Sequence, residues 1–128
     1  MGALGDLERD CLARYCALLS ERLGERLVRI SMFGSAARAD MWPRRSPMHS
    51  DIDLLVVTRE EIAAAEQEEL VNETYPLYLE CGRQLSPAFF GEARLADPPD
   101  ERTREFLAQI AGELIEVFSP QAPPGATG

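Results

Sequence analysis

The amino-acid sequence predicts a single α/β or α+β domain, in which helices pack on a sheet. Segments with helical periodicity alternate with three short apolar runs of strand length, and turn residues separate them. The chain has 128 residues, of which 45% are hydrophobic, so it can bury one core. We assign residues 1–118 to the domain. Residues 119–128 are rich in proline and glycine and are expected to form a flexible C-terminal tail.

The expected elements follow one another as helix, strand, helix, strand, helix, strand, helix. Apolar steps of three and four residues predict the helices, and short β-branched runs predict the strands. Asp6 is the expected N-cap of the first helix, Gly24 its stop, and Pro76 should kink or end the acidic helix. The sequence predicts longer helices over residues 5–25, 59–80 and 99–117, a short one after residue 35, and strands over residues 27–33, 51–58 and 83–90.

Composition excludes several classes of function. The net charge of −9 argues against a nucleic-acid partner, because phosphate backbones favour a basic surface. All thirteen basic residues are arginine, which excludes lysine-based covalent chemistry. Without a run of about eighteen apolar residues or a signal-peptide layout, we expect a cytoplasmic protein with no membrane contact. Cys11, Cys16 and Cys81 lack C-x-x-C spacing, so we expect small buried side chains instead of a disulfide framework or zinc site.

Two aspartates open the second predicted strand. Side chains alternate along a strand, so Asp51 and Asp53 should share one face while Ile52 and Leu54 occupy the other. Two neighbouring carboxylates repel each other, and a fold therefore keeps them in open water or around a cation. One interpretation is a solvated turn at the start of the strand. The other is a binding site for a hard divalent cation.

The first predicted strand ends in a pair of small residues, Gly34 and Ser35. Gly34 has no Cβ, so a phosphate oxygen could approach its backbone, and the N–H groups that open the following helix favour an anion. Ser35 adds a hydroxyl donor. Arg38, one turn further on, could reach phosphate as a forked donor, or it could be a surface arginine beside Asp40.

The stretch FGSAARAD, followed after a loop by SDIDLLVV, resembles the core motif of the DNA polymerase beta-like nucleotidyltransferase superfamily. It is most similar to the small prokaryotic minimal nucleotidyltransferase domains. The resemblance implies a small mixed sheet flanked by helices and magnesium-dependent transfer of a nucleoside monophosphate from a nucleoside triphosphate, with ATP as the first choice. By the motif, Gly34 and Ser35 contact the triphosphate, and Asp51 and Asp53 are the catalytic, Mg²⁺-binding residues.

The sequence departs from the family pattern in one respect that divides two hypotheses. Active members usually carry a third carboxylate on a later strand, but the predicted strand RQLSPAFF has none. Gln84 or Ser86 would take its place as a neutral ligand, and Glu80 could stand in for it. The first hypothesis is a transferase that acts on an acceptor hydroxyl, possibly on a partner protein. The second is a weak or inactive module that serves as the antitoxin or regulatory partner of a HEPN-type protein, as the resemblance implies.

Overall fold

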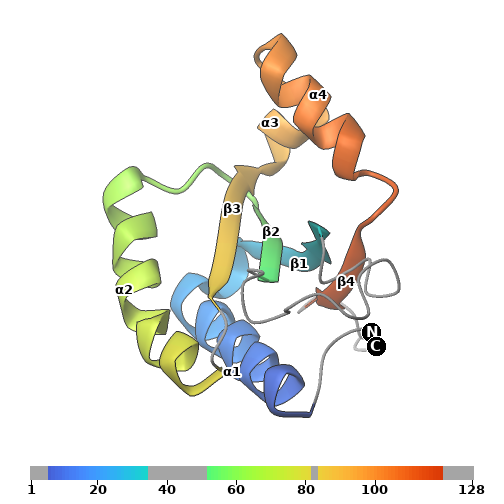
Figure 1. The fold of residues 1–128 in the computed structure, drawn as a ribbon. Coiled ribbons are helices and arrows are strands. Elements are labelled where there is room, and N and C mark those ends of the chain that lie inside the picture. The colour runs from blue at the N-terminus through green and yellow to red at the C-terminus, as the bar shows by residue number, and fades with distance from the viewer. Residues whose placement is uncertain (1–5, 35–51, 82–83, 120–128) are drawn as a thin grey trace, which may run out of the picture.

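The computed structural model describes residues 6–34, 52–81 and 84–119. Figure 1 shows the chain as a ribbon. The elements in chain order are α1 (Asp6–Leu23), the 3-10 turn η1 (Gly24–Arg26), β1 (Leu27–Phe33), β2 (Ile52–Thr58), α2 (Ala64–Cys81), β3 (Leu85–Gly91), α3 (Glu92–Ala96), α4 (Glu101–Ile110) and β4 (Ile115–Phe118).

The four strands form one mixed sheet in the order β3-β2-β1-β4. β1 is antiparallel to both of its neighbours, β2 and β4, whereas β2 and β3 are parallel. Two strands that are consecutive in the described chain can be parallel because α2 connects them across one face of the sheet (Figure 1). The predicted fold class, a small mixed sheet flanked by helices, is therefore confirmed.

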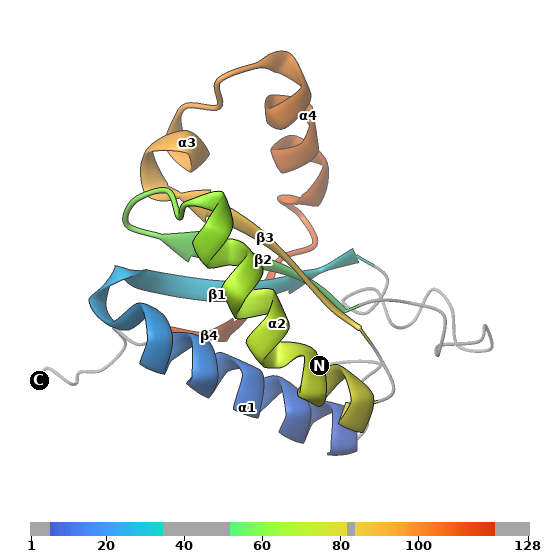
Figure 2. The same ribbon diagram turned by 90° about the vertical axis from the view of Figure 1, so that its left-hand side faces the viewer.

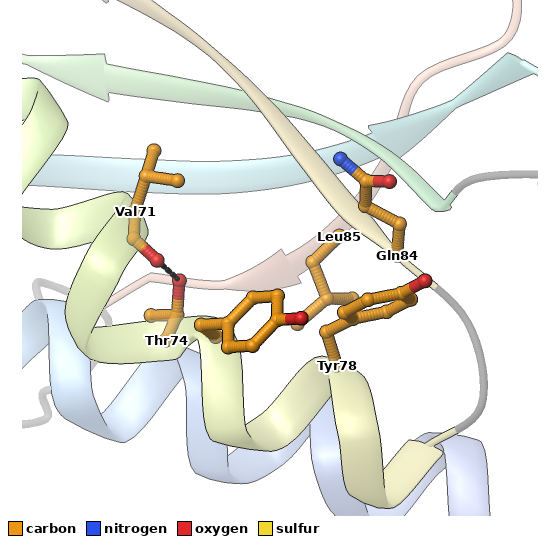
Figure 3. Close-up of a pocket in the computed structure, with 6 residues that line it drawn as sticks. Val71, Thr74, Tyr78, Gln84 and Leu85 are labelled. Carbon is orange, nitrogen blue, oxygen red and sulfur yellow. Dashed lines mark hydrogen bonds between the residues drawn. The ribbon is translucent and has the colours of Figure 1, made fainter.

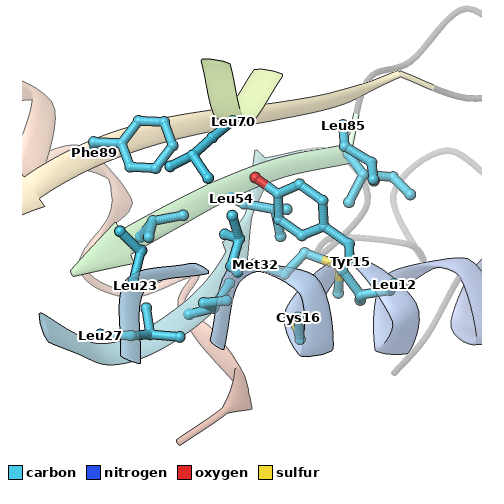
Figure 4. Packing of buried hydrophobic residues seen from close by; sticks show 14 of the residues in the cluster. Leu12, Tyr15, Cys16, Leu23, Leu27, Met32, Leu54, Leu70, Leu85 and Phe89 are labelled. Atoms are coloured by element: carbon cyan, nitrogen blue, oxygen red, sulfur yellow. The ribbon is translucent and has the colours of Figure 1, made fainter. Parts of the chain in front are cut away.

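The helices α1 and α2 cover one face of the sheet (Figure 2), and the larger hydrophobic cluster lies between them and that face. Every second residue at the start of β2 faces this layer, as strand geometry requires: Ile52, Leu54 and Val56 are fully buried in it. Figure 4 shows the packing, with Tyr15 of α1 among the leucines. Burial raises the pKa of the Tyr15 phenol, so this side chain stays neutral in the core.

A smaller cluster covers the opposite face of the sheet, beneath α3 and α4. Leu55 and Val57 of β2 belong to it, together with Ile110 of α4. Phe106 of α4 anchors the layer, because its ring meets Phe33 edge-on with centroids 5.7 Å apart and stacks on Phe90 at 6.2 Å. β2 is thus buried on both faces, which explains its nearly continuous apolar sequence.

Three ion pairs on the protein surface join α1 and η1 to α2. Arg14 pairs with Glu80, Arg22 with Glu73 and Arg26 with Glu66, each with a shortest N–O distance of 2.7 Å. The Arg26 pair is bidentate, and the hydrogen bonds from Arg26 lower the pKa of Glu66 below its ordinary value. All these groups are partly solvated, so each pair contributes little to stability and mainly fixes the two helices in register.

The turn residues glycine and proline explain where some elements end and where others do not. α1 ends where Gly24 takes a φ of 58°, a left-handed conformation that favours glycine. β3 lies at the edge of the sheet, where Pro87 is tolerated because an edge strand needs fewer ladder donors. α2 begins five residues later than predicted. It also continues past Pro76, so this residue does not end the helix.

The prediction that the last helix reaches residue 117 is wrong. α4 begins after Asp100, whose side chain accepts a hydrogen bond from the Thr103 N–H at 2.8 Å. This bond lowers the pKa of Asp100, so the cap is present at neutral pH and is lost as the pH falls through that lowered value. The helix ends at Ile110, and the next apolar residues pair with β1 as β4. Pairing with a distant strand overrides the helical spacing.

The cysteines differ from one another. Cys16 is buried and free, and burial raises the pKa of its thiol to about 12, so it is unreactive. Cys11 is fully buried, as expected, but it is disulfide-bonded, so the expectation that it takes part in no disulfide is wrong. Sequence spacing could not show this, because a disulfide depends on proximity in the fold. In the described ranges, no helix combines the length and apolar character needed to cross a membrane.

The larger cluster should provide most of the stability. We expect Leu54→Ala to lower the free energy of unfolding by about 2–5 kcal/mol, because Leu54 is completely buried and its loss leaves a cavity. Leu79→Ala is the matched control: this leucine is 63% exposed, and its loss should change stability by less than about 0.5 kcal/mol. Urea unfolding followed by circular dichroism measures both. Equal losses in the two variants would contradict the assignment of the core.

Candidate functional site

Gly34 and Asp53, two of the predicted site residues, lie at one end of the sheet. β1 finishes there, and β2, β3 and β4 all begin there, as their registers require. Phe33 pairs with Asp53, so Gly34, the next residue, lies directly beside the start of β2. Two segments nearly twenty residues apart in the sequence therefore meet at a single point, as the motif predicts.

Gly34 has a backbone conformation and a setting that both require glycine. Its φ is 80°, in the left-handed region that other residues rarely adopt. A Cβ at this position would overlap Oδ2 of Asp53 and lie 3.3 Å from its Cγ. The carboxylate of Asp53 thus packs directly against the backbone of Gly34. A group that binds to this turn must also meet that carboxylate.

Asp53 is half-buried and lies on the α4 side of the sheet. Its neighbours Ile52 and Leu54 face α1 and α2, while Leu55, two residues further on, lies in the cluster beneath α4. Asp53 therefore stands at the end of the row of β2 residues that faces α4, next to the buried Leu55. A carboxylate oxygen at such an edge is a suitable ligand for a hard cation.

A hydroxyl lies beside Asp53 on the neighbouring strand. Ser86 of β3 pairs with Asp53 across the parallel ladder and is therefore its direct neighbour on the same face. The alternative candidate, Glu80, lies on α2 and pairs with Arg14 on the other side of the sheet. Gln84 precedes β3, and its backbone carbonyl accepts a hydrogen bond from the Ile52 N–H.

Sequence reasoning missed one acidic residue of the site, Glu113. Its Oε1 accepts a hydrogen bond of 3.0 Å from the backbone N–H of Gly34, in a partly buried setting. Glu113 stands between α4 and β4, in the stretch that helical spacing wrongly assigns to the last helix. The antiparallel pairing of Met32 with Ile115 brings it to this end of the sheet. No local signal in the sequence reveals that pairing.

Three predicted residues lie outside the described residues: Ser35, Arg38 and Asp51. The structure therefore brings Gly34 and Asp53 together, adds Ser86 and Glu113 beside them, and says nothing of the other three. Within the described part of the chain, no group of three or more His, Cys, Asp or Glu side chains could hold a metal ion. The oxygen donors that are present, carboxylates and a hydroxyl, suit a hard divalent cation better than a soft one.

A separate shallow hollow of about 90 Å³ lies between α2 and β3, away from Asp53. Figure 3 shows Tyr78 beside Gln84, with the Thr74 hydroxyl donating to the carbonyl of Val71 at 3.0 Å. Next to the hollow, α2 exposes a stripe of apolar side chains at helical spacing. We call it the α2 stripe, and it consists of Val71, Tyr75 and Leu79, which are 46%, 54% and 63% exposed.

Solved structures share this arrangement of helices and strands. A chain from a crystal structure of a mutant MntA–HpeT toxin–antitoxin complex matches with a TM-score of 0.57 and 17% identity, over 86% of this chain and 73% of that one. A toxin–antitoxin structure with AMP-PNP gives 0.54 and 15%, over 84% and 73%. A candidate minimal nucleotidyltransferase gives 0.51 and 28%, over 91% of this chain and 100% of that one.

No protein-family model and no curated protein matches the sequence. The structural likeness is therefore what defines the class. The chain has the fold of the minimal nucleotidyltransferases, and the resemblance that the motif indicates is confirmed at the level of the fold. The neighbours include chains of toxin–antitoxin complexes.

Proposed function

We propose that this protein is a magnesium-dependent nucleotidyltransferase, which moves the monophosphate of a nucleoside triphosphate, ATP in the first instance, to an acceptor hydroxyl on a partner protein. The observation that carries the proposal is the direct contact between Gly34 and the carboxylate of Asp53 at one end of the sheet. The fold of the structural neighbours supports the proposal, and one of these neighbours was solved with AMP-PNP. The charge of −9 favours a protein acceptor over a nucleic acid.

Each residue has a distinct role in this reaction. The backbone of Gly34 and the hydroxyl of Ser35 hold the β- and γ-phosphates, and Arg38 adds a forked donor. Asp51 and Asp53 are the ligands for Mg²⁺, with Ser86 as a neutral neighbour. When bound, magnesium supplies neutralisation of the charge on the phosphates. The acceptor oxygen forms a bond to the α-phosphorus as the bond to the pyrophosphate oxygen breaks; pyrophosphate leaves, and the acceptor hydroxyl gives up its proton to solvent.

The test has two steps. ATP is first titrated calorimetrically into the protein with magnesium and then with EDTA, and the protein is next incubated with labelled ATP in lysate from the source cells. Magnesium-dependent binding, followed by transfer of the label to a macromolecule, would support the proposal. The Asp53→Asn variant is the control, and label transferred equally by this variant would come from another enzyme. Binding without transfer would instead favour the second candidate below.

The second candidate is a regulatory module that keeps the fold without turnover, as the antitoxin partner of a HEPN-type protein. The hydroxyl of Ser86, which pairs with Asp53 across the ladder, favours it, because a neutral oxygen in place of a charged ligand weakens divalent-metal binding. The α2 stripe also favours it, since such an exposed apolar row marks an interaction surface. Glu68 and Glu69 are exposed beside the stripe, and their charge disfavours a second copy and favours a partner with a basic rim.

We expect Leu79→Glu to weaken the complex with a HEPN-type partner by at least about tenfold, because it places a charge within the apolar α2 stripe. Leu79 is 63% exposed, so the variant should keep its melting temperature. Gln109→Glu, which adds the same charge at an exposed position on α4, is the matched control and should leave the affinity unchanged. Co-purification and calorimetry with the HEPN-type protein measure both. Equal affinities for the two variants would show that the α2 stripe is not the interface.

A further inference from the structure

The carboxylate of Glu113 already accepts a hydrogen bond from the backbone N–H of Gly34, which the proposed nucleotide site would use to bind phosphate. The N–H of Gly34 points at Glu113 Oε1, 3.0 Å away. Backbone interactions on both sides of Glu113 in the sequence fix its position. Glu113 is fixed by its own N–H, which donates to the Ile110 carbonyl at 2.8 Å, and by the pairing of β4 with β1 immediately after it. This is a built contact between segments 79 residues apart in the sequence.

We propose that Glu113 is a specificity-determining residue, which competes with the triphosphate for the N–H of Gly34 and makes the site select the metal-bound nucleotide. The inference rests on the proposed function, because it assumes that phosphate binds at this turn. It assigns to Glu113 a role that neither the motif nor the structural likeness supplies.

Charge explains the competition. The N–H of Gly34 is a single donor, and a hydrogen bond to a carboxylate is of the strong, charge-assisted kind. A phosphate oxygen that approaches this N–H must displace Oε1 of Glu113. It also approaches the carboxylate of Asp53, which packs against the same glycine. A free triphosphate therefore meets two like charges in a partly buried setting, where screening is weaker than in bulk water.

A divalent cation changes this balance. With its charge partly neutralised, the nucleotide is repelled less by Asp53 and Glu113, so the cost of displacing Glu113 is offset. Glu113 thus acts mainly against the metal-free nucleotide. A purely structural role, in which Glu113 only caps the end of β1, makes the opposite prediction, because loss of the cap would loosen the glycine turn and weaken binding of both forms.

The experiment compares the affinity for ATP in EDTA and in magnesium for the intact protein and three variants. Glu113→Gln removes the charge but keeps an acceptor oxygen of the same shape, and Glu113→Ala removes both. Glu116→Gln is the matched control, because Glu116 is exposed on β4, three residues away. We expect Glu113→Ala to bind ATP in EDTA about tenfold more tightly than the intact protein, equivalent to about 1.4 kcal/mol. Glu113→Gln should gain less, both gains should shrink in magnesium, and Glu116→Gln should match the intact protein.

The outcomes separate the inference from the proposed function. If the intact protein binds magnesium-ATP but neither Glu113 variant binds ATP in EDTA more tightly than the intact protein does, the inference is overturned and the proposed function stands. If neither the intact protein nor any variant binds ATP in either condition, the proposed function fails, and the inference fails with it. Melting temperatures show which variants fold. Should Glu113→Ala not fold, Glu113→Gln decides alone, because it preserves the hydrogen bond to Gly34.

Discussion

Asp53→Asn is expected to abolish magnesium-dependent ATP binding while leaving the melting temperature unchanged or higher. The amide has the shape of the carboxylate but none of its charge, so it is a much poorer ligand for Mg²⁺. Asp53 and Glu113 both contact Gly34, so removal of one charge also reduces their mutual repulsion in the free protein. Calorimetric titration of ATP in magnesium, together with thermal unfolding, measures both effects.

Asp97→Asn is the matched control for this prediction. Asp97 is an exposed aspartate between α3 and α4, and its change should leave both binding and stability as they are. Two results would contradict the expectation. An Asp53→Asn variant that unfolds would make the aspartate structural, and one that binds magnesium-ATP like the intact protein would remove Asp53 from the proposed metal site.

Gly34→Ala should both destabilise the protein and end ATP binding. A left-handed backbone costs an L-residue about 1–2 kcal/mol, and here the added methyl group also overlaps the Asp53 carboxylate. Gly24→Ala is the matched control, because Gly24 also has a positive φ, of 58°, but its Cβ would meet nothing within 4 Å. We therefore expect Gly24→Ala to show only the backbone cost, and Gly34→Ala to lose about twice as much free energy of unfolding.

The double variant Gly34→Ala with Asp53→Gly isolates the steric part of the effect. If the overlap with the carboxylate causes the extra loss, removal of that side chain should recover it, and the two changes will be non-additive. Additive losses, measured by chemical denaturation, would mean that the alanine is strained by its backbone alone. ATP binding should be absent in both variants that carry the alanine.

The local patterns in the sequence predict most of the fold and part of the candidate site. The two-residue period of a strand places Ile52 and Leu54 on one face, and Gly24 marks the end of α1 through its conformational freedom. The motif pairs Gly34 with the aspartate strand, and the structure brings Gly34 into contact with Asp53. The roles of Ser35, Arg38 and Asp51 stay predictions.

What the sequence could not predict depends on distant pairing. Apolar residues at 106, 107, 110, 114 and 117 fit a helix by their spacing, yet Ile115 and Val117 belong to a strand because β1 has an edge that they can complete. The same error concealed Glu113. A residue in a predicted helix is not expected at the end of a sheet, and only the register of β4 against β1 places it beside Gly34.

The two layers of the core differ greatly in size, and this difference should divide the protein into regions that open independently. Sixteen buried residues hold α1 and α2 to the sheet, whereas four form the cluster under α4 among the described residues. The α4 layer should therefore unfold locally at a lower free energy, and its amides should exchange with deuterium before those of β2. Glu113 follows α4 directly, so each such opening would also release the N–H of Gly34. Local unfolding of one small layer and access to the proposed phosphate site would then be a single event.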